Sequence, residues 1–347
     1  MNNPIFKRED FVLCDVPVPQ GYPQSQTHSG VAWYDGRLYL TSTPYPNRRL
    51  SRWRIYFNVL LRKLSNGMLI KDAEIYENPC LYVSDKNQLS EIPTTFSPLA
   101  PFPLMDTPKK EYGLPAFNSD PDIFIENGHC YILNRTVCRT RLLKHGYECK
   151  TKIFLIIGEV GKETFELKKI QQIKEWNKPY VSPCLIKHNG KYILSYLDTN
   201  SAIDAKSFCG LYLQQLSALD NLSRCNEYKE IKISAGRLLP WHMSLFSSRG
   251  RLYSIIACVK RNDKSRKIWQ MLGEFNDNLT ELTIYRTPLT DYQSYRGSAF
   301  VREDGLFVLY NTTLWENVQG SKSVDGRNII VATKSFYELL KEIRIRQ

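Results

Sequence analysis

A short motif recurs five times along this chain of 347 residues. Each copy is a turn that ends in glycine, followed by a basic or apolar residue and then a strand-like run with an aromatic side chain. The glycines of the five copies are Gly36, Gly128, Gly190, Gly250 and Gly305. Asp-Gly and Asn-Gly pairs between apolar runs favour tight β-hairpins, because both turn residues must tolerate a positive φ. The sequence therefore predicts five β-hairpins.

The spacing of the copies predicts an all-β fold, a five-bladed β-propeller that forms one domain over residues 1–347. Successive glycines are 92, 62, 60 and 55 residues apart. These intervals suit blades of about 40 to 50 residues with added loops. Further strand-like runs between the turns allow four strands per blade. Radial closure explains the repeat with short, protected edges, although an all-β solenoid or a sandwich stays open.

Two segments depart from the repeat. The long first interval predicts a proline-rich loop between blades 1 and 2 that crosses one face, because proline interrupts regular strand pairing. The interval contains Pro93, Pro98, Pro101, Pro103, Pro108 and Pro115, among other prolines. Near the C-terminus, Phe336, Leu339, Leu340 and Ile343 recur at spacings of three or four residues. This periodicity predicts a short C-terminal helix over residues 335–345.

Composition bounds the class of the protein. Hydrophobic residues make up 42% and charged residues 24% of the chain, as in soluble globular proteins. The charged N-terminal stretch does not resemble a signal peptide, and no run of about 18 apolar residues occurs, so we expect neither export nor a membrane partner. Nine cysteines without CxxC spacing suggest reduced thiols. We therefore expect a cytoplasmic protein, although a phage-particle component released by lysis would look the same.

The net charge of +12 suits a polyanionic partner such as nucleic acid, anionic lipid or an acidic glycan. The basic residues are dispersed, and small clusters such as Lys109-Lys110 and Lys260-Arg261 are typical of solvated surfaces. The sequence contains no basic-aromatic array of the kind that binds single strands and no recognisable nucleic-acid module. We therefore expect no nucleic-acid partner.

The start of each predicted inner strand carries polar residues. In a propeller these strands open onto the mouth of the central channel, so equivalent positions converge there. The residues eight positions before the five glycines are His28, Asp120, Ser182, His242 and Gly297. Those nine positions before are Thr27, Ser119, Val181, Trp241 and Arg296. This set of polar residues predicts a functional cavity. The alternative is that polar residues at strand entrances only form hydrogen bonds with backbone groups or with one another.

These side chains suggest specific chemistry. Asp120 is suited to act as a general base or to raise the pKa of a histidine, and His28 or His242 to donate a proton to a leaving oxygen. Arg296 suits an anionic group, and Trp241 offers an apolar face on which a sugar ring stacks. His28, His242 and Asp120 are also a ligand set for a divalent cation, although their spacing carries no metal signature.

Five segments mark the predicted blade entrances. They are Glu77-Asn78-Pro79-Cys80-Leu81-Tyr82-Val83-Ser84, Asn118-Ser119-Asp120-Pro121-Asp122-Ile123, Val181-Ser182-Pro183, Pro240-Trp241-His242 and Tyr295-Arg296-Gly297-Ser298. In order, and across nearly the whole chain, they resemble the blade-entry motifs of the five-bladed propellers of the glycoside hydrolase family 43 type. Active members of that family carry an Asp base, a second Asp and a Glu acid at successive entrances. Only Asp120 matches this pattern, because His28 stands at the first entrance and Ser182 at the third.

Three interpretations follow from the resemblance. In the first, Asp120 is the base and His242 or His28 replaces the missing Glu as the acid, as in a related branch of sugar-cleaving propellers. In the second, Arg296 and the histidines serve a sugar or phosphosugar transferase, or a lyase. In the third, the protein is a non-catalytic glycan-binding, virion or surface-polymer component.

We take the first interpretation as the prediction: a glycoside hydrolase-like enzyme acting on an acidic or substituted oligo- or polysaccharide at the central cavity. The predicted catalytic residues are Asp120, His242 and His28. The predicted substrate-binding residues are Ser119, Ser182, Trp241, Tyr295 and Arg296. We expect no cofactor, apart from the divalent cation that the axis would accept.

Overall fold

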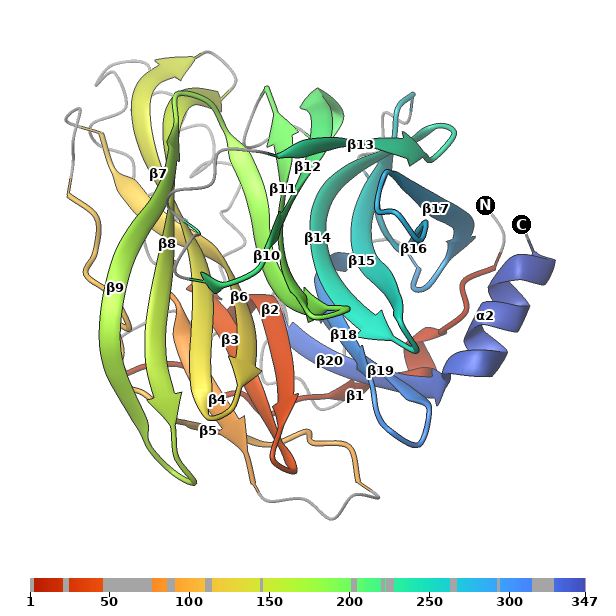
Figure 1. Ribbon diagram of the computed structural model, residues 1–347, viewed down its shortest axis with the longest axis horizontal. Helices are drawn as coiled ribbons and strands as arrows, with labels where there is room; N and C mark the ends of the chain where they lie inside the picture. The colour runs from red at the N-terminus through yellow and green to blue at the C-terminus, as the bar shows by residue number, and fades with distance from the viewer. Residues whose placement is uncertain are drawn as a thin grey trace, which may run out of the picture.

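The computed structural model describes residues 3–20, 25–45, 77–85, 91–109, 114–143, 146–200, 205–219, 222, 228–262, 267–291, 294–313 and 328–346. This part of the chain consists mainly of β-strands in four sheets (Figure 1). One sheet contains β2 (Ser25–Tyr34), β3 (Arg37–Tyr45), β4 (Cys80–Ser84) and β5 (Phe96–Pro98). The next contains β6 (Ala116–Glu126), β7 (His129–Leu143), β8 (Gly146–Val160) and β9 (Phe165–Trp176).

The other two sheets hold the C-terminal half of the chain and its N-terminal strand. An eight-stranded sheet contains β10 (Tyr180–His188), β11 (Lys191–Thr199), β12 (Phe208–Leu216), β13 (Lys229–Ser234), β14 (Leu238–Ser248), β15 (Arg251–Lys260), β16 (Ile268–Phe275) and β17 (Glu281–Pro288). The last sheet contains β1 (Val12–Leu13), β18 (Ser294–Val301), β19 (Leu306–Thr313) and β20 (Asn328–Ser335). Two short 3-10 helices, η1 (Arg8–Asp10) and η3 (Ala205–Ser207), precede β1 and β12.

The five predicted hairpins are confirmed. They are β2–β3, β6–β7, β10–β11, β14–β15 and β18–β19, all antiparallel. The turn glycines have φ values between 71° and 84°, and in four turns the residue before the glycine also has a positive φ. Such a pair of residues is typical of a two-residue type I′ turn, whose twist matches that of the strands. The fifth turn is longer and connects Val301 to Phe307.

The inner strands of the hairpins form a closed ring. β2 contacts β6, β6 contacts β10, β10 contacts β14, β14 contacts β18, and β18 contacts β2. The N-terminal strand β1 pairs with β20, so strands from the beginning and the end of the chain lie in one sheet (Figure 1). A parallel pairing of β13 with β17 merges two antiparallel groups of four strands into the eight-stranded sheet.

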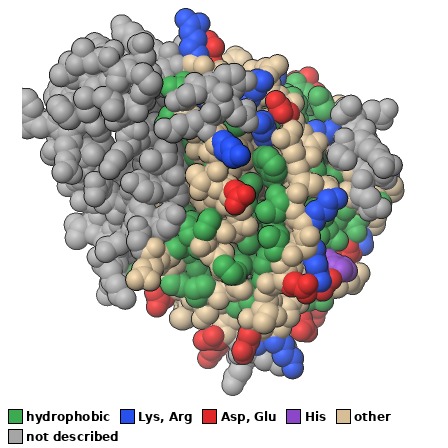
Figure 2. All heavy atoms as spheres, turned by 90° about the vertical axis from the view of Figure 1, so that its left-hand side faces the viewer, with side chains coloured by type: hydrophobic (Ala, Val, Ile, Leu, Met, Phe, Trp, Pro, Cys, Tyr) green, Lys and Arg blue, Asp and Glu red, His purple; other side chains and the backbone are tan. Residues whose placement is uncertain are grey.

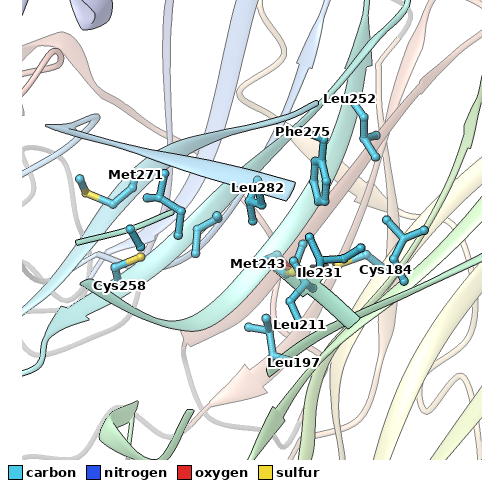
Figure 3. Close-up of a cluster of buried hydrophobic side chains, with 14 of the residues drawn as sticks. Cys184, Leu197, Leu211, Ile231, Met243, Leu252, Cys258, Met271, Phe275 and Leu282 are labelled. Carbon is cyan, nitrogen blue, oxygen red and sulfur yellow. Dashed lines mark hydrogen bonds between the residues drawn. The ribbon is translucent and has the colours of Figure 1, made fainter. Parts of the chain in front are cut away.

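Apolar side chains fill the spaces between neighbouring groups of strands. One cluster lies between β10–β13 and β14–β17 and includes Met243, Phe275 and Leu282 (Figure 3). A second lies between β14–β17 and the last sheet and includes Phe246 and Phe307. Each sheet is stable only when its apolar faces are covered, so these clusters hold the inner strands in place.

The helix α2 (Phe336–Ile345) confirms the predicted C-terminal helix. Its first turn is capped by Ser335, whose hydroxyl accepts a hydrogen bond from the N–H of Glu338. Phe336, Leu339 and Ile343 are buried in the cluster that contains Phe246 and Phe307, which is the face that the periodicity predicted.

The proline-rich interval differs in part from the prediction. Pro98 lies in β5, where it pairs with Tyr82. β5 is an edge strand, and proline is tolerated there because one side of the strand needs no donor. Pro93, Pro101, Pro103, Pro108 and Pro115 lie outside strands. The crossing of one face by this segment stays a prediction, since residues 46–76, 86–90 and 110–113 lie outside the described residues.

The surface is mixed in character. On the face that Figure 2 shows, which is the β9 side of the molecule, basic and acidic side chains are interspersed among apolar ones. Exposed large apolar residues on this strand are Leu167 and Ile170. Among the described residues, no helix combines the length and hydropathy that crossing a bilayer requires.

Candidate functional site

Each inner strand is interrupted by a β-bulge near its start. The pairing register shifts between Thr27 and Gly30, Ser119 and Asp122, Val181 and Cys184, Pro240 and His242, and Ser294 and Gly297. Three of the bulged residues have a left-handed backbone: His28 with φ 59°, Asp120 with φ 52° and Ser182 with φ 52°. Non-glycine residues rarely adopt this conformation, and bulges re-aim side chains, so the backbone here is shaped to turn these groups toward one another.

In the fifth repeat, the residue at the strand entrance differs from the one that counting eight positions back from the turn glycine predicted. Gly297, eight residues before the turn glycine, is back in regular pairing, and the bulge falls on Tyr295 and Arg296. The longer fifth turn is the reason, because it moves its glycine away from the strand entrance. Tyr295 is therefore the residue that corresponds to His28, Asp120, Ser182 and His242.

Asp120 lies at the centre of the site and is fully buried. Its Oδ2 accepts a hydrogen bond from the N–H of Ser182 at 3.1 Å and lies 3.2 Å from Nε of Arg135. Its Oδ1 lies 3.2 Å from Nε2 of His28 and 3.7 Å from Nδ1 of His242. Burial alone would raise the pKa of Asp120, but Arg135 and the neighbouring basic groups outweigh it and hold the pKa well below its usual range. Asp120 is therefore a carboxylate.

His28 lies between two carboxylates. Its Nε2 faces Asp120, while its Nδ1 is 3.4 Å from Oε2 of Glu77 and 3.2 Å from the hydroxyl of Thr43. The imidazole is 2% exposed, and Glu77 is 4% exposed. Nδ1 thus has a hydrogen-bond partner in Thr43, and Nε2 lies against a carboxylate oxygen.

His242 presents one engaged nitrogen and one open one. Its Nδ1 is 2.9 Å from the hydroxyl of Ser182, and Asp120 faces the same nitrogen. Its Nε2 is buried and has no hydrogen-bond partner among the described residues. Burial lowers the pKa of His242 well below its usual value, although Asp120 opposes the shift, so the imidazole is neutral near pH 7. Ser182 and Asp120 both face Nδ1 of His242. In a catalytic triad the serine and the carboxylate bond to opposite nitrogens of the histidine, so this arrangement is not a triad.

Two aromatic rings border the histidines. The Tyr295 ring lies 5.1 Å from the His28 ring and 4.8 Å from the His242 ring, and Trp241 lies 5.3 Å from His242. Trp241 and Tyr295 are half-buried, whereas His28 and His242 are each 2% exposed. The aromatic pair is therefore the part of the cluster that faces solvent.

The structure places Arg296 differently from the other predicted site residues. It is fully buried, its Nη1 donates a hydrogen bond to the carbonyl oxygen of Pro121 at 3.0 Å, and its Nη2 lies 3.5 Å from Oδ1 of Asp122. Burial raises the pKa of Asp122 to about 6, against the pull of Arg296 and the N–H of Leu185. Arg296 thus joins β18 to the bulge of β6 and does not present its charge to a ligand.

Sequence reasoning gave no role to four residues of the site, which are Thr43, Glu77, Asp122 and Arg135. Glu77 and Asp122 had been noted only as members of the blade-entrance segments. Arg135 is opposite Ser119 in the β6–β7 hairpin, and a hairpin register drawn from the Asn127-Gly128 turn would have found it. Ser119, predicted to bind substrate, is buried with its hydroxyl 3.5 Å from Oδ1 of Asp120. Glu77 and Thr43 come from outside the inner strands, so the comparison of repeat positions did not reach them.

Three of the predicted residues form a cluster of donor atoms. His28, Asp120 and His242 each offer one ligand atom, and these atoms lie within 4.8 Å of one another. Two imidazoles and one carboxylate are a common ligand set for zinc and similar cations. Nε2 of His28 and Nδ1 of His242 lie 3.2 Å and 3.7 Å from Oδ1 of Asp120, an approach of two nitrogens to one carboxylate oxygen that fits such an ion.

Comparison with known proteins places the fold. No family model matches the chain, and no curated protein matches its sequence. The structure is similar to an N-acetylgalactosamine deacetylase from F. plautii, solved with blood group B trisaccharide, with a TM-score of 0.62 and 14% identity over 95% of this chain and 97% of that chain. It is also similar to CoXyl43, a family 43 β-xylosidase/α-arabinofuranosidase from a compost microbial metagenome, solved with xylotriose in a calcium-free form. There the TM-score is 0.57 and the identity 13%, over 89% of this chain and 91% of that chain.

A third similar structure is a family 117 glycoside hydrolase from Zobellia galactanivorans, with a TM-score of 0.54 and 11% identity over 94% of this chain and 91% of that chain. The chain has the β-propeller fold of these enzymes. The expected likeness to family 43 propellers is therefore confirmed at the level of the fold. At identities of 11 to 14% the likeness is one of fold.

Proposed function

We propose that this protein is a carbohydrate-active hydrolase that works at the centre of a five-bladed propeller, with the eight-stranded sheet counted as two blades. One observation carries the proposal: a neutral, buried imidazole, His242, keeps its Nε2 open beside two half-buried aromatic rings. Trp241 and Tyr295 supply the apolar surface on which a sugar ring packs, and His242 supplies a proton acceptor next to it.

The roles differ from those expected from the sequence. Arg135, Ser182 and His28 occupy the oxygens of Asp120. Nε2 of His242 has no such partner among the described residues, so we assign Asp120 to stabilising charge on His242. His242 then takes a proton from the attacking water through Nε2 while the new bond forms between the water oxygen and the substrate carbon. The imidazolium formed is stabilised by Asp120, 3.7 Å from Nδ1. It returns the proton to the leaving oxygen or nitrogen as the bond between that atom and the substrate carbon breaks.

A divalent cation fits the same cluster. His28, Asp120 and His242 would hold it, and their two nitrogen donors favour a zinc-like ion over calcium, which prefers six to eight oxygen ligands. Such an ion would supply a Lewis acid and lower the pKa of a bound water. Adding it should raise the melting temperature of wild type, and His28→Gln should remove that rise.

The substrate class is a glycan. Enzymes with this fold were solved with a trisaccharide and with xylotriose, and the net charge of +12 favours an acidic polymer. With Arg296 paired to Asp122, that preference rests on the overall charge and not on a dedicated anion-binding residue. A cytoplasmic location and a single domain stay predictions.

A screen of aryl glycosides and acetylated polysaccharides tests the proposal, with release of aryl alcohol, reducing sugar or acetate as the signal. We expect turnover by wild type and a loss of about 10²- to 10⁴-fold in kcat for His242→Gln, the scale of one proton-transfer residue. His188→Gln is the matched control, because His188 is also buried but lies at the turn end of β10, bonded to Ser247. Equal losses in both variants would contradict the assignment.

The near-complete burial of Asp120 and His28 favours one alternative, a non-catalytic glycan-binding propeller. In that case the screen shows no turnover by wild type, while calorimetric titration with oligosaccharides shows binding that Trp241→Ala weakens. Turnover that depends on His242 excludes this alternative.

A further inference from the structure

We propose that a row of aromatic side chains beside the central site is a second glycan-binding surface, which holds sugar units of a polysaccharide outside that site. We call this row the outer platform; it consists of Trp176, Tyr180, Tyr196, Tyr212 and Tyr228. The proposal rests on the proposed function, since it takes a glycan as the ligand. It makes a polymer the preferred form of that ligand.

The four tyrosines of the outer platform belong to successive strands. Tyr180 begins β10, Tyr196 lies in β11, Tyr212 lies in β12, and Tyr228 comes directly before β13. They recur at intervals of 16 residues in the sequence. β10 belongs to the inner ring of strands, and β11, β12 and β13 follow it in that order within the sheet. The row therefore runs from the ring of inner strands to the outside of the blade.

The rings of the outer platform adjoin one another. The centre of the Tyr196 ring lies 5.3 Å from that of Tyr180, 6.3 Å from that of Tyr212 and 5.9 Å from that of Tyr228. Tyr212 and Tyr228 are 5.7 Å apart. Trp176, at the end of β9, lies 4.2 Å from Tyr180 and 4.9 Å from Tyr196. The five rings therefore form one continuous aromatic cluster.

Exposure increases toward the outside of the blade. Tyr180 and Tyr196 are buried in the apolar cluster between two groups of strands, so packing explains them. Trp176 and Tyr212 are half-buried, and Tyr228 is 40% exposed. Packing does not explain why three partly exposed rings surround Tyr196, because contiguous exposed apolar surface is typical of binding sites.

A charge pair accompanies the rings. Asp198 lies two residues after Tyr196 in β11, so the two side chains are on the same face of the sheet. Asp198 accepts a hydrogen bond from Nζ of Lys178, which lies 5.1 Å from the centre of the Tyr180 ring. Asp198 is 2% exposed, and its Oδ1 has no hydrogen-bond partner among the described residues. Such an acceptor suits a hydroxyl group, which would donate the missing hydrogen bond.

A sugar matches this combination of groups. Aromatic faces cover the apolar C–H side of a sugar ring, while a carboxylate and an ammonium group bond its hydroxyls. Because Lys178 is paired with Asp198, the two charges offset each other, and the outer platform favours a sugar ring over a phosphate group or another small anion.

The outer platform is continuous with the central site through the start of β10. The carbonyl oxygen of Tyr180 accepts a hydrogen bond from Nη1 of Arg135 at 3.1 Å, and Nε of Arg135 lies 3.2 Å from Asp120. Two residues after Tyr180, the N–H of Ser182 donates to the same carboxylate. One strand start thus serves both surfaces, so a polymer longer than the central site would also engage the outer platform.

Affinity electrophoresis through gels that contain xylan, dextran, pectate or alginate tests the proposal. We expect at least one of these polymers to retard wild type. Tyr228→Ala should raise the Kd for that polymer about 10-fold, the scale of one lost ring contact, and Tyr228→Phe should keep the wild-type value. Tyr337→Ala is the matched control, because Tyr337 is 68% exposed but lies on α2. It should leave the Kd unchanged.

The proposal is overturned if none of the four polymers retards wild type, or if Tyr228→Ala binds as tightly as wild type. An equal loss in Tyr337→Ala would also overturn it, because binding would then not depend on the platform. Turnover of aryl glycosides by wild type is measured separately, since these small substrates need only the central site. Turnover without a Tyr228 effect refutes the platform and leaves the hydrolase. Polymer binding that depends on Tyr228 without any turnover refutes the hydrolase and leaves the platform.

Discussion

Arg296→Met should destabilise the protein strongly and in a pH-dependent way. Arg296 is fully buried, donates to the carbonyl oxygen of Pro121 and lies 3.5 Å from Asp122. Methionine keeps most of the side-chain volume but removes the charge and the donors. The variant leaves a buried carboxylate without its cation and a carbonyl oxygen without its hydrogen bond.

The magnitude follows from the burial of the pair. Removing one partner of a buried ion pair costs about 3–5 kcal/mol. At about 2.1 cal/mol/K per residue, the unfolding entropy of a chain this long is roughly 0.7 kcal/mol/K, so the melting temperature should fall by about 4–7 °C. An exposed arginine is the control: Arg251 pairs with Glu274 through a half-exposed side chain, and Arg251→Met should change the stability far less, because solvent screens an exposed pair.

The pH dependence separates charge from packing. Burial raises the pKa of Asp122 to about 6 in wild type, so its contribution to stability is fully present below about pH 4 and is lost as the pH rises through about 6. Without Arg296 the pKa rises further. Asp122 is neutral in both proteins at pH 5. At higher pH it ionises beside Arg296 in wild type, whereas in the variant it must either stay protonated or become a buried charge without a partner. The deficit of the variant should therefore grow between pH 5 and pH 8.

Thermal and urea unfolding of wild type, Arg296→Met and Arg251→Met at pH 5 and pH 8 measure these differences. A deficit that is equal at the two pH values would mean that lost packing, and not the buried charge, is the cause. A melting temperature within about 1 °C of wild type at pH 8 would refute the role of Arg296 as a brace between β18 and β6.

Three further predictions concern the site. Gly30→Ala should destabilise by about 1–3 kcal/mol in chemical unfolding, because an added Cβ would lie 2.8 Å from the hydroxyl of Thr41 within the first hairpin; unchanged stability would show that this contact relaxes freely. Trp241→Ala should raise KM for a glycan up to about 10-fold with kcat nearly unchanged, and an equal fall in kcat would place Trp241 in the chemical step instead. On acidification, kcat/KM should fall only below the pH at which histidines usually titrate, because burial lowers the pKa of His242. Asp120→Asn should move this fall to still lower pH, because it removes the carboxylate that opposes the shift. A fall that moves to higher pH in the variant would contradict the pairing of Asp120 with His242.

The hairpins and the C-terminal helix were predictable because they depend on local chemistry. A turn such as Asn189-Gly190 needs positive φ values at neighbouring residues, and few residue pairs satisfy that need. The periodicity of Phe336, Leu339 and Ile343 likewise reports which face of a helix is buried. The distance of a residue from its turn then located His28, Asp120, Ser182 and His242, since strands that start at equivalent turns run in register.

Only the tertiary structure decided what these residues do to one another. The longer fifth turn moved Tyr295 into the position that counting had given to Gly297, and the bulge buried Arg296 against Asp122 instead of exposing it. Glu77 lies in no repeat, yet folding places its carboxylate 3.4 Å from His28. The five hairpins of the repeated motif were set by the sequence itself, because turns and strand periods are local. The charge and hydrogen bonding of the site depend on distances between segments far apart in the chain, and those exist only once the ring of inner strands has closed.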